Sequence, residues 1–414
     1  MALMTPKMTP HAELRQALYR ARAQTDSLFD LVDPAALYER PIPERHRIVF
    51  YLGHLEAFDW NLLGRALDMP AFHAGFDRLF SFGIDPDSTD LPTDQPADWP
   101  AAEEVRGYNA RVRRDLDAGL ARASGDVPEE LLHVAIEHRL MHAETFAYML
   151  HHLPFEQKVP PAFSTASSGP SPETRMVEIP AGPATLGRKY GEGFGWDNEF
   201  DLHQVDVPAF AIAQHKVTNG GYLEFVDAGA APPHFWVRRK DEWFYRGMFA
   251  DIPLPLDWPV YVSYDQAQAY AQWKGKALPT EPQFHRAAYP AQNPYGAGSQ
   301  PAAASQAAPL FARENVDFRS WDPEPVSASP PNRLGLSQLV GNGWEWTATR
   351  FEPFPGFQPL SFYPGYSANF FDGQHYVLKG GSPRTARCLL RPSFRNWFRP
   401  AYPYIYATFR LVEN

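Results

Sequence analysis

The chain has 414 residues, of which 44% are hydrophobic and 14% aromatic, as in a packed globular protein long enough for two domains. Its net charge of -10, without a clustered basic stripe, argues against a nucleic-acid partner. Because the sequence shows neither a secretory leader nor a run of about 20 apolar residues, we expect a cytoplasmic protein without a membrane partner. A single cysteine, Cys388, excludes an intramolecular disulfide and a cysteine-based zinc cluster, so a metal would need histidine or carboxylate ligands.

Apolar residues at helical spacing predict four helices in the first part of the chain, which together favour an antiparallel bundle. Their predicted ranges are 11–32, 44–67, 101–123 and 128–153. The stretch 69–100 is too polar and rich in proline to be a simple connection, which indicates a functional loop.

The composition changes after the last predicted helix. Residues 154–173 are dense in Pro, Ser and Gly and are predicted to be a linker between a domain at 1–153 and a domain at 174–414. From 174 onward, short β-like runs alternate with Gly and Pro turns and a few short helices. The sequence therefore predicts an α+β multidomain protein whose second domain is irregular.

Histidines of the helical part form a candidate metal site. His138 and His142, in EHRLMHAET, are four residues apart and share one helix face, although an isolated pair of this kind is more often structural. His54, in FYLGHLEAFDW, lies among apolar residues of the second predicted helix and could face the fourth. Three histidines without a carboxylate ligand suit zinc or iron(II), and the residues alone leave both open.

Other residues near this cluster have less specific signals. Glu144 and Glu56 could orient the imidazoles as hydrogen-bond acceptors, or be solvated carboxylates. His133, His151 and His152 have offsets that turn them toward other helix faces, and we expect them at the surface.

The second half resembles the formylglycine-generating-enzyme/sulfatase-modifying-factor family over about residues 174–414. The resemblance rests on a series of segments in order: HKVTNGGYLEFV, YVSYDQAQAYAQWKGKALPTEPQFHRAA, NRLGLSQLVGNGWEWTATR, VLKGGSPRTA, RPSFRNWF and ATFRLV. It implies a C-type-lectin-like fold. The first half resembles the DinB-like four-helix bundle, and this combination, with FGWDNE at 194–199, resembles the ergothioneine-type non-haem iron sulfoxide synthases.

That resemblance implies which residues act. His54, His138 and His142 match the positions that bind iron(II), with O2 as co-substrate and the imidazole betaine hercynine as acceptor. In SFYPGYSANFF, Tyr363 matches the proton donor and Tyr366 a hydrogen-bonding residue of the pocket; the alternative is aromatic packing at a turn.

Residues at the other end of the implied pocket match less completely. Asn396 and Trp397 match positions that contact hercynine, and a Trp face suits its quaternary ammonium. The loop reads RLFSFGIDPDSTD without the usual arginine pair, the Asn-Trp pair is followed by Phe398 instead of an acid, and Met141 stands where a Gln is frequent. These departures resemble the selenoneine synthase branch and favour a selenosugar as donor.

Two cysteines would be needed for the copper chemistry of the formylglycine-generating enzymes, so Cys388 alone cannot support it. The alternatives are a sulfoxide synthase that uses cysteine or another thiol, a zinc-bound thiol transferase or hydrolase, and a binding module without catalysis. The sequence leaves open a structural calcium ion, the oxidation state of the product, and whether the protein is a monomer or a homodimer.

Overall fold

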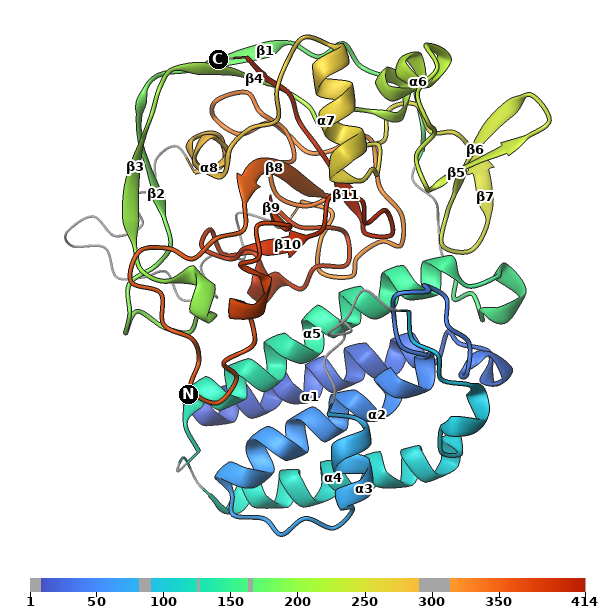
Figure 1. Cartoon of the computed structure of the whole chain (residues 1–414), viewed down its shortest axis with the longest axis vertical. Coiled ribbons are helices and arrows are strands. Elements are labelled where there is room, and N and C mark those ends of the chain that lie inside the picture. Colours follow the sequence, from blue (N-terminus) through green and yellow to red (C-terminus); the bar gives the residue numbers. More distant parts are fainter. Residues whose placement is uncertain are drawn as a thin grey trace, which may run out of the picture. The chain divides into compact units, whose positions relative to one another are not determined.

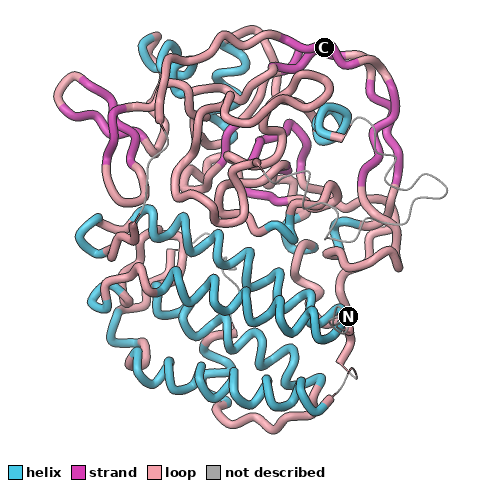
Figure 2. Tube along the Cα trace, turned by 180° about the vertical axis from the view of Figure 1, so that it is seen from behind, coloured by secondary structure: helices cyan, strands magenta, loops and turns pink. Residues whose placement is uncertain are grey.

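The computed structural model describes residues 9–81, 91–123, 125, 127–162, 167–289 and 313–413. The chain forms two compact units, Met1–Phe163 and Ser164–Asn414. The first is helical and the second contains short strands and helices, which confirms the predicted fold class (Figure 2). Residues 82–90 of the predicted functional loop and 163–166 of the predicted linker lie outside the described residues.

The first unit is a bundle of long helices joined by shorter helical pieces (Figure 1). Helix α1 packs against α5, and α2 packs against both α4 and α5. The α-helices of this unit are α1 (Pro10–Phe29), α2 (Ile48–Asp59), α3 (Ala74–Leu79), α4 (Ala102–Arg122) and α5 (Glu129–His152). Short 3-10 helices follow at Pro34–Ala36, Pro96–Asp98 and Phe155–Gln157.

Helix α2 is the central helix of the bundle. Every one of its residues except Phe58 is buried, because it is apolar around nearly its whole circumference. It continues directly into a π-helical turn at Trp60–Gly64, a widened turn of a kind often found at functional sites. The predicted helix 44–67 therefore begins later than expected, at Ile48, and it contains a π turn just before its last residues, Arg65 and Ala66, which apolar spacing cannot reveal.

A buried ionic cluster joins α2 to α5. The guanidinium of Arg139 donates to Glu56 Oε1 at 2.9 Å and to Asp59 Oδ2 at 2.7 Å, and all three side chains are at most 1% exposed. Arg113 on α4 also donates to Glu56, at 2.6 Å. Burial alone would raise the pKa of Glu56, but Arg139 and Arg113 outweigh it and lower that pKa to about 2. The carboxylate is therefore ionised and held from two helices.

The second unit contains small separate sheets connected by long loops. One sheet has the strand order β1-β4-β12, and a second has the order β10-β9-β8-β11. A third sheet pairs β2 with β3, and a fourth has the order β5-β6-β7. The strands are β1 (Met176–Ile179), β2 (Gly182–Leu186), β3 (His203–Val207), β4 (Phe210–Ala213), β5 (Trp236–Arg239), β6 (Glu242–Arg246), β7 (Asp251–Pro253), β8 (Trp344–Arg350), β9 (Tyr376–Lys379), β10 (Asn396–Phe398), β11 (Ala407–Thr408) and β12 (Val412–Glu413).

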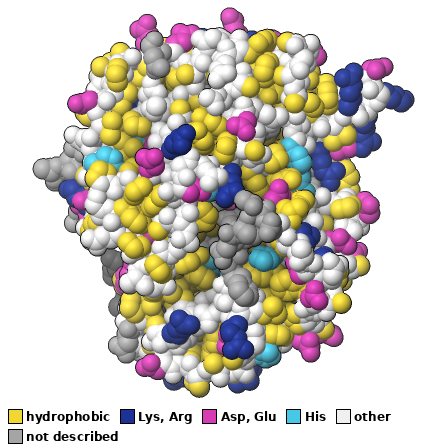
Figure 3. Space-filling view, in the orientation of Figure 1, with side chains coloured by type: hydrophobic (Ala, Val, Ile, Leu, Met, Phe, Trp, Pro, Cys, Tyr) yellow, Lys and Arg dark blue, Asp and Glu magenta, His cyan; other side chains and the backbone are white. Residues whose placement is uncertain are grey.

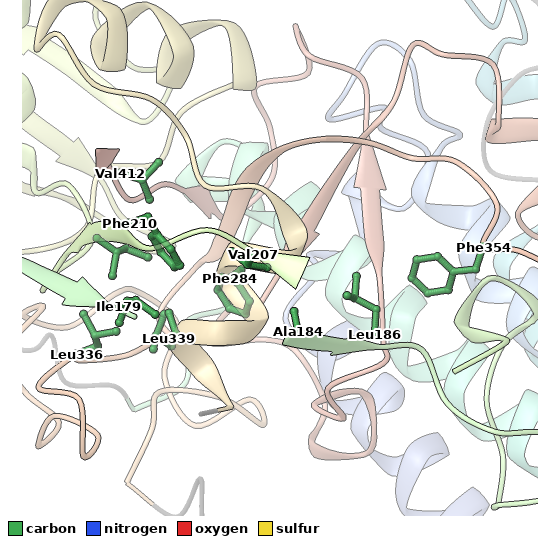
Figure 4. Close-up of a cluster of buried hydrophobic side chains, with 12 residues drawn as sticks. Ile179, Ala184, Leu186, Val207, Phe210, Phe284, Leu336, Leu339, Phe354 and Val412 are labelled. Atoms are coloured by element: carbon green, nitrogen blue, oxygen red, sulfur yellow. The ribbon is translucent and has the colours of Figure 1, made fainter. Parts of the chain in front are cut away.

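Capping residues begin the three helices of this unit, α6 (Asn219–Asp227), α7 (Tyr264–Trp273) and α8 (Glu281–Ala288). The side chains of Ser263 and Thr280 each accept a hydrogen bond from the backbone N–H of the glutamine three residues later. The side chain of that glutamine in turn accepts from the backbone N–H of Ser263 or Thr280. An apolar cluster then packs α8 against the β2-β3 ribbon and against β1, β4 and β12 (Figure 4). Phe284 of α8 lies at its centre and is fully buried.

Charged residues of the family motifs form a second buried ionic cluster. Lys216 from HKVTNGGY and Arg410 from ATFRLV both donate to Glu345 from GNGWEW, at 2.7 and 2.9 Å, and the three side chains are 0% exposed. Burial lowers the pKa of Lys216 to about 8, although Glu345 partly opposes this effect. These motif residues therefore hold segments of the fold together and do not face a ligand.

Two further features concern the hydropathy of the helices and the charged side chains of the surface. Among the described residues, no helix is both long and apolar enough to cross a lipid bilayer. On the face drawn in Figure 3, basic and acidic side chains are interspersed, and basic ones gather most densely on the protruding β5-β6 hairpin, which carries Arg238, Arg239 and Lys240.

We predict that Arg139→Met destabilises the bundle by about 3–5 kcal/mol, because it leaves Asp59 as a buried charge without its main partner. Denaturant unfolding of the full chain, followed through its helical circular dichroism, measures this change. The matched control is Arg114→Met, whose exposed pair with Asp115 contributes at most about 1 kcal/mol. Equal stability of both variants would show that the buried cluster does not hold α2 to α5.

Candidate functional site

Three histidines from two helices meet inside the bundle. His54 on α2 and His138 and His142 on α5 are each less than 5% exposed, and their candidate ligand atoms all lie within 4.8 Å of one another. The Nε2 atom of His142 is 3.2 Å from Nε2 of His54 and 3.1 Å from Nε2 of His138. Within the described part of the chain, no other group of three potential ligands converges in this way.

These separations fit one transition-metal ion. Two imidazole nitrogens about 2.1 Å from a metal lie about 3.0 Å apart at a right angle and about 3.4 Å apart at the tetrahedral angle. The observed 3.2 and 3.1 Å fall between these values. The geometry is therefore compatible with zinc or iron(II).

The three imidazoles are neutral at physiological pH, as metal ligands must be. Burial lowers the pKa of His54 to about 4, against a smaller opposite effect of its hydrogen bond to Phe80. Burial also lowers the pKa values of His138 and His142 well below the usual value, and the neighbouring histidines add to this effect. Their lone pairs are consequently available.

The backbone around Phe80 fixes which nitrogen of His54 faces the cluster. Nδ1 of His54 lies 2.6 Å from the Phe80 carbonyl oxygen, which can only accept, so Nδ1 carries the proton and Nε2 the lone pair. Phe80 reaches this place because residue 53 is glycine: a Cβ there would lie 2.6 Å from the Phe80 ring. The Phe50 ring stacks on His54 at a centroid distance of 4.9 Å, and the Phe58 ring stacks on His138 at 3.4 Å.

The surroundings of this cluster differ in part from the predictions. Among the described residues, neither His138 Nδ1 nor His142 Nδ1 has a hydrogen-bond partner, and Glu144 is buried on the same helix. Glu56 binds Arg113 and Arg139 instead of an imidazole. His151 was expected at the surface but is 0% exposed, because the last turn of α5 is covered by the chain around Lys158.

The tyrosines of the second unit lie in a cluster of aromatic rings. Tyr363 and Tyr366 have ring centroids 5.7 Å apart, and Tyr366 meets Trp397 edge-on at 5.5 Å. Tyr366 is 8% exposed and Tyr363 is partly exposed. Phe351 stacks on Trp397 at 4.2 Å. Sequence-distant residues predicted to bind substrate are thus brought together within this unit.

The remaining predicted residues have distinct surroundings. Strand β10 consists of Asn396, Trp397 and Phe398, which are all partly exposed at the edge of their sheet. Oδ1 of Asn396 accepts from the Trp397 backbone N–H at 2.9 Å, and Phe398 stacks on Tyr402 at 5.4 Å. Met141 is partly exposed on α5, directly before His142.

The residues of FGWDNE, for which no individual roles were predicted, lie beside these tyrosines. Trp196 stacks on Tyr366 at 3.9 Å, and Asp197 accepts a hydrogen bond from Ser367 at 2.5 Å. Both contacts hold the tyrosine-bearing loop. The signal that could have found them is the density of aromatic and charged residues in this short segment.

Known families match both units. Residues 162–414 match the Sulfatase-modifying factor enzyme 1-like domain, and residues 17–156 match the DinB superfamily. The chain is 32% identical to the Hercynine oxygenase of Mycolicibacterium thermoresistibile, over 99% of this chain and 96% of the relative. It is 33% identical to the Hercynine oxygenase of Mycobacterium tuberculosis, over 98% of this chain and 99% of the relative.

A fungal relative is longer. Ergothioneine biosynthesis protein 1 of Neurospora crassa is 29% identical over 91% of this chain, which spans only 55% of that protein's length. The two nearly full-length bacterial relatives and the two domain matches together show that the chain belongs to the ergothioneine-type sulfoxide synthase family.

Proposed function

We propose that this protein is an iron(II)- and O2-dependent enzyme that forms a carbon–selenium or carbon–sulfur bond at C2 of the hercynine imidazole. The observation that carries the proposal is the convergence of the Nε2 atoms of His54, His138 and His142 in a buried, neutral cluster. The names of the bacterial relatives supply the acceptor, hercynine, and an oxidative reaction.

His54, His138 and His142 would hold the metal through Nε2 and leave one side of its coordination sphere open for substrates. Bound iron(II) would supply redox activity toward O2, which zinc lacks. None of the three ligands carries a charge, so the ion keeps its full positive charge toward the substrates. The hydrogen bond from Nδ1 to the Phe80 carbonyl keeps His54 in the tautomer that this arrangement needs.

Residues of the second unit would bind hercynine and move a proton. Tyr363 would donate a proton through its hydroxyl while O2 is reduced, and Tyr366 would hydrogen-bond in the pocket. The Trp397 face suits a trimethylammonium group through cation-π attraction. With Oδ1 engaged by the backbone, Asn396 can present its amide nitrogen to a carboxylate.

For the donor we favour a selenosugar. Phe398 is partly exposed next to Trp397 and stacks on Tyr402. Its ring would form an aromatic wall for a sugar, and it has no charge that could bind a charged dipeptide. Met141 beside His142 adds a soft, apolar contact. A cysteine-type thiol donor is the second candidate, and it is favoured by the name of the fungal relative, Ergothioneine biosynthesis protein 1.

We predict that His138→Ala weakens iron(II) binding by at least about 100-fold. Removing only the hydrogen-bond partner of a metal ligand typically lowers metal affinity by about 10- to 100-fold, and removing the ligand itself should lower it more. Iron content after anaerobic purification and titration measures this loss. His133→Ala on the same helix is the matched control and should keep its iron. Full activity of the wild-type protein with zinc alone would overturn the assignment of iron.

We expect Tyr363→Phe to lower kcat by about 10²- to 10⁴-fold with unchanged iron content, because the variant loses a proton donor and keeps the ring. Steady-state O2 consumption with hercynine measures the effect. Tyr190→Phe, at an exposed tyrosine of the same unit, should remain near wild type. An unaltered kcat in Tyr363→Phe would remove the proton-donor role.

Donor competition tests the selenosugar. Hercynine is incubated with equal concentrations of a selenosugar, cysteine and γ-glutamylcysteine, and the products are separated by mass. We expect the selenium product to exceed the others by at least about tenfold, equivalent to about 1.4 kcal/mol in transition-state binding. Phe398→Asp should raise use of the glutamyl peptide, whereas Phe398→Leu should not. A dominant sulfur product in the wild-type protein would identify the thiol donor instead.

A further inference from the structure

Residues 360–367, named here the tyrosine segment, carry both Tyr363 and Tyr366 outside any helix or strand. Its internal backbone bonds are two turns, from Tyr363 N to Leu360 O at 3.2 Å and from Tyr366 N to Tyr363 O at 3.1 Å. Turns of this kind bend the chain but do not fix it in space. A hydroxyl on this segment therefore needs an anchor elsewhere in the unit.

The carboxylate of Asp197 binds the last residue of the tyrosine segment. Oδ1 accepts from the Ser367 hydroxyl at 2.5 Å. Asp197 is 1% exposed and Ser367 is 0% exposed, so water does not compete with this bond. Next to it, the Trp196 ring lies nearly parallel to Tyr366, at 3.9 Å and 19°.

Asp197 is itself held firmly. It begins the 3-10 helix Asp197–Glu199, whose Glu199 is fully buried and accepts from the Trp196 backbone N–H at 2.8 Å. Glu199 also binds Arg391 through Nε at 2.8 Å and the Ser393 hydroxyl at 2.6 Å. The same short helix thus joins the tyrosine segment to the chain that leads into β10.

We propose that Asp197 is a positioning residue that anchors the tyrosine segment through Ser367 and so determines where the Tyr363 hydroxyl lies. The inference rests on the proposed role of Tyr363 as proton donor. Charge-assisted hydrogen bonds are short and directional, and displacement of a reacting group by about 1 Å can cost about 100-fold in rate. FGWDNE then acts in catalysis through the tyrosine segment and does not touch substrate.

The substitution Asp197→Ala tests the anchor, because it removes the acceptor of the Ser367 hydroxyl. Ser367→Ala removes the donor of the same bond with a smaller change of volume. Asp206→Ala, at an exposed aspartate of β3, is the matched control.

Hydrogen exchange of the full-length protein measures the anchoring independently of activity. In Asp197→Ala we expect the amides of Tyr363 and Tyr366 to exchange at least about tenfold faster, and in Ser367→Ala by a similar factor. Exchange in β9 and in α5 should be unchanged in both variants. Unchanged exchange of the tyrosine segment in both variants would overturn the inference.

Kinetics separate this inference from the function on which it rests. Asp197→Ala should lower kcat about 10- to 100-fold, with the KM for hercynine and the iron content near wild type. Added to Tyr363→Phe, it should cost less than twofold more, because both act through one hydroxyl. If the tyrosine segment exchanges faster in the Asp197 variant but Tyr363→Phe is fully active, the proton-donor role is refuted and the anchor stands. If Tyr363→Phe has a low kcat but exchange of the segment is unchanged in the Asp197 and Ser367 variants, only the anchor is refuted.

Discussion

The bundle depends on the pairing of Arg139 with Glu56 and Asp59. Arg139 directly follows His138 on α5, and its two carboxylate partners follow His54 on α2. A shift of one helix by a turn, about 5.4 Å, would leave these buried charges unpaired. The pairing therefore fixes the register in which histidines 88 positions apart bring their Nε2 atoms to 3.2 Å.

This arrangement also explains why the cluster contains only neutral imidazoles. The nearby carboxylates Glu56 and Asp59 form ion pairs with Arg139. Burial lowers the pKa of all three histidines, and the positive charge of Arg139 lowers it further. The bundle thus separates its charges: ion pairs stabilise one part of the α2–α5 contact, and uncharged imidazoles occupy another. A metal bound there would meet no competing carboxylate among these residues.

Much of the fold and of the histidine cluster could be predicted from local patterns. The i, i+4 spacing of His138 and His142 and the apolar surroundings of His54 depend only on nearby residues. The partners of Glu56, the burial of His151 and the bond between Asp197 and Ser367, 170 positions apart, depend on tertiary packing. The π turn after α2 likewise leaves no mark in apolar spacing.

The family motifs of the second unit specify its scaffold more than its chemistry. Lys216, Glu345 and Arg410 come from three separate motifs, yet they are fully buried and bind one another. Loss of Glu345 would leave both buried cations without this partner, so these residues serve the scaffold and can be shared by proteins with different substrates. Phe398, by contrast, is partly exposed on the edge strand β10, where a substitution leaves this ionic cluster intact. Resemblance in the motifs thus identifies the family, and it leaves positions such as Phe398, outside the buried scaffold, free to differ between its members.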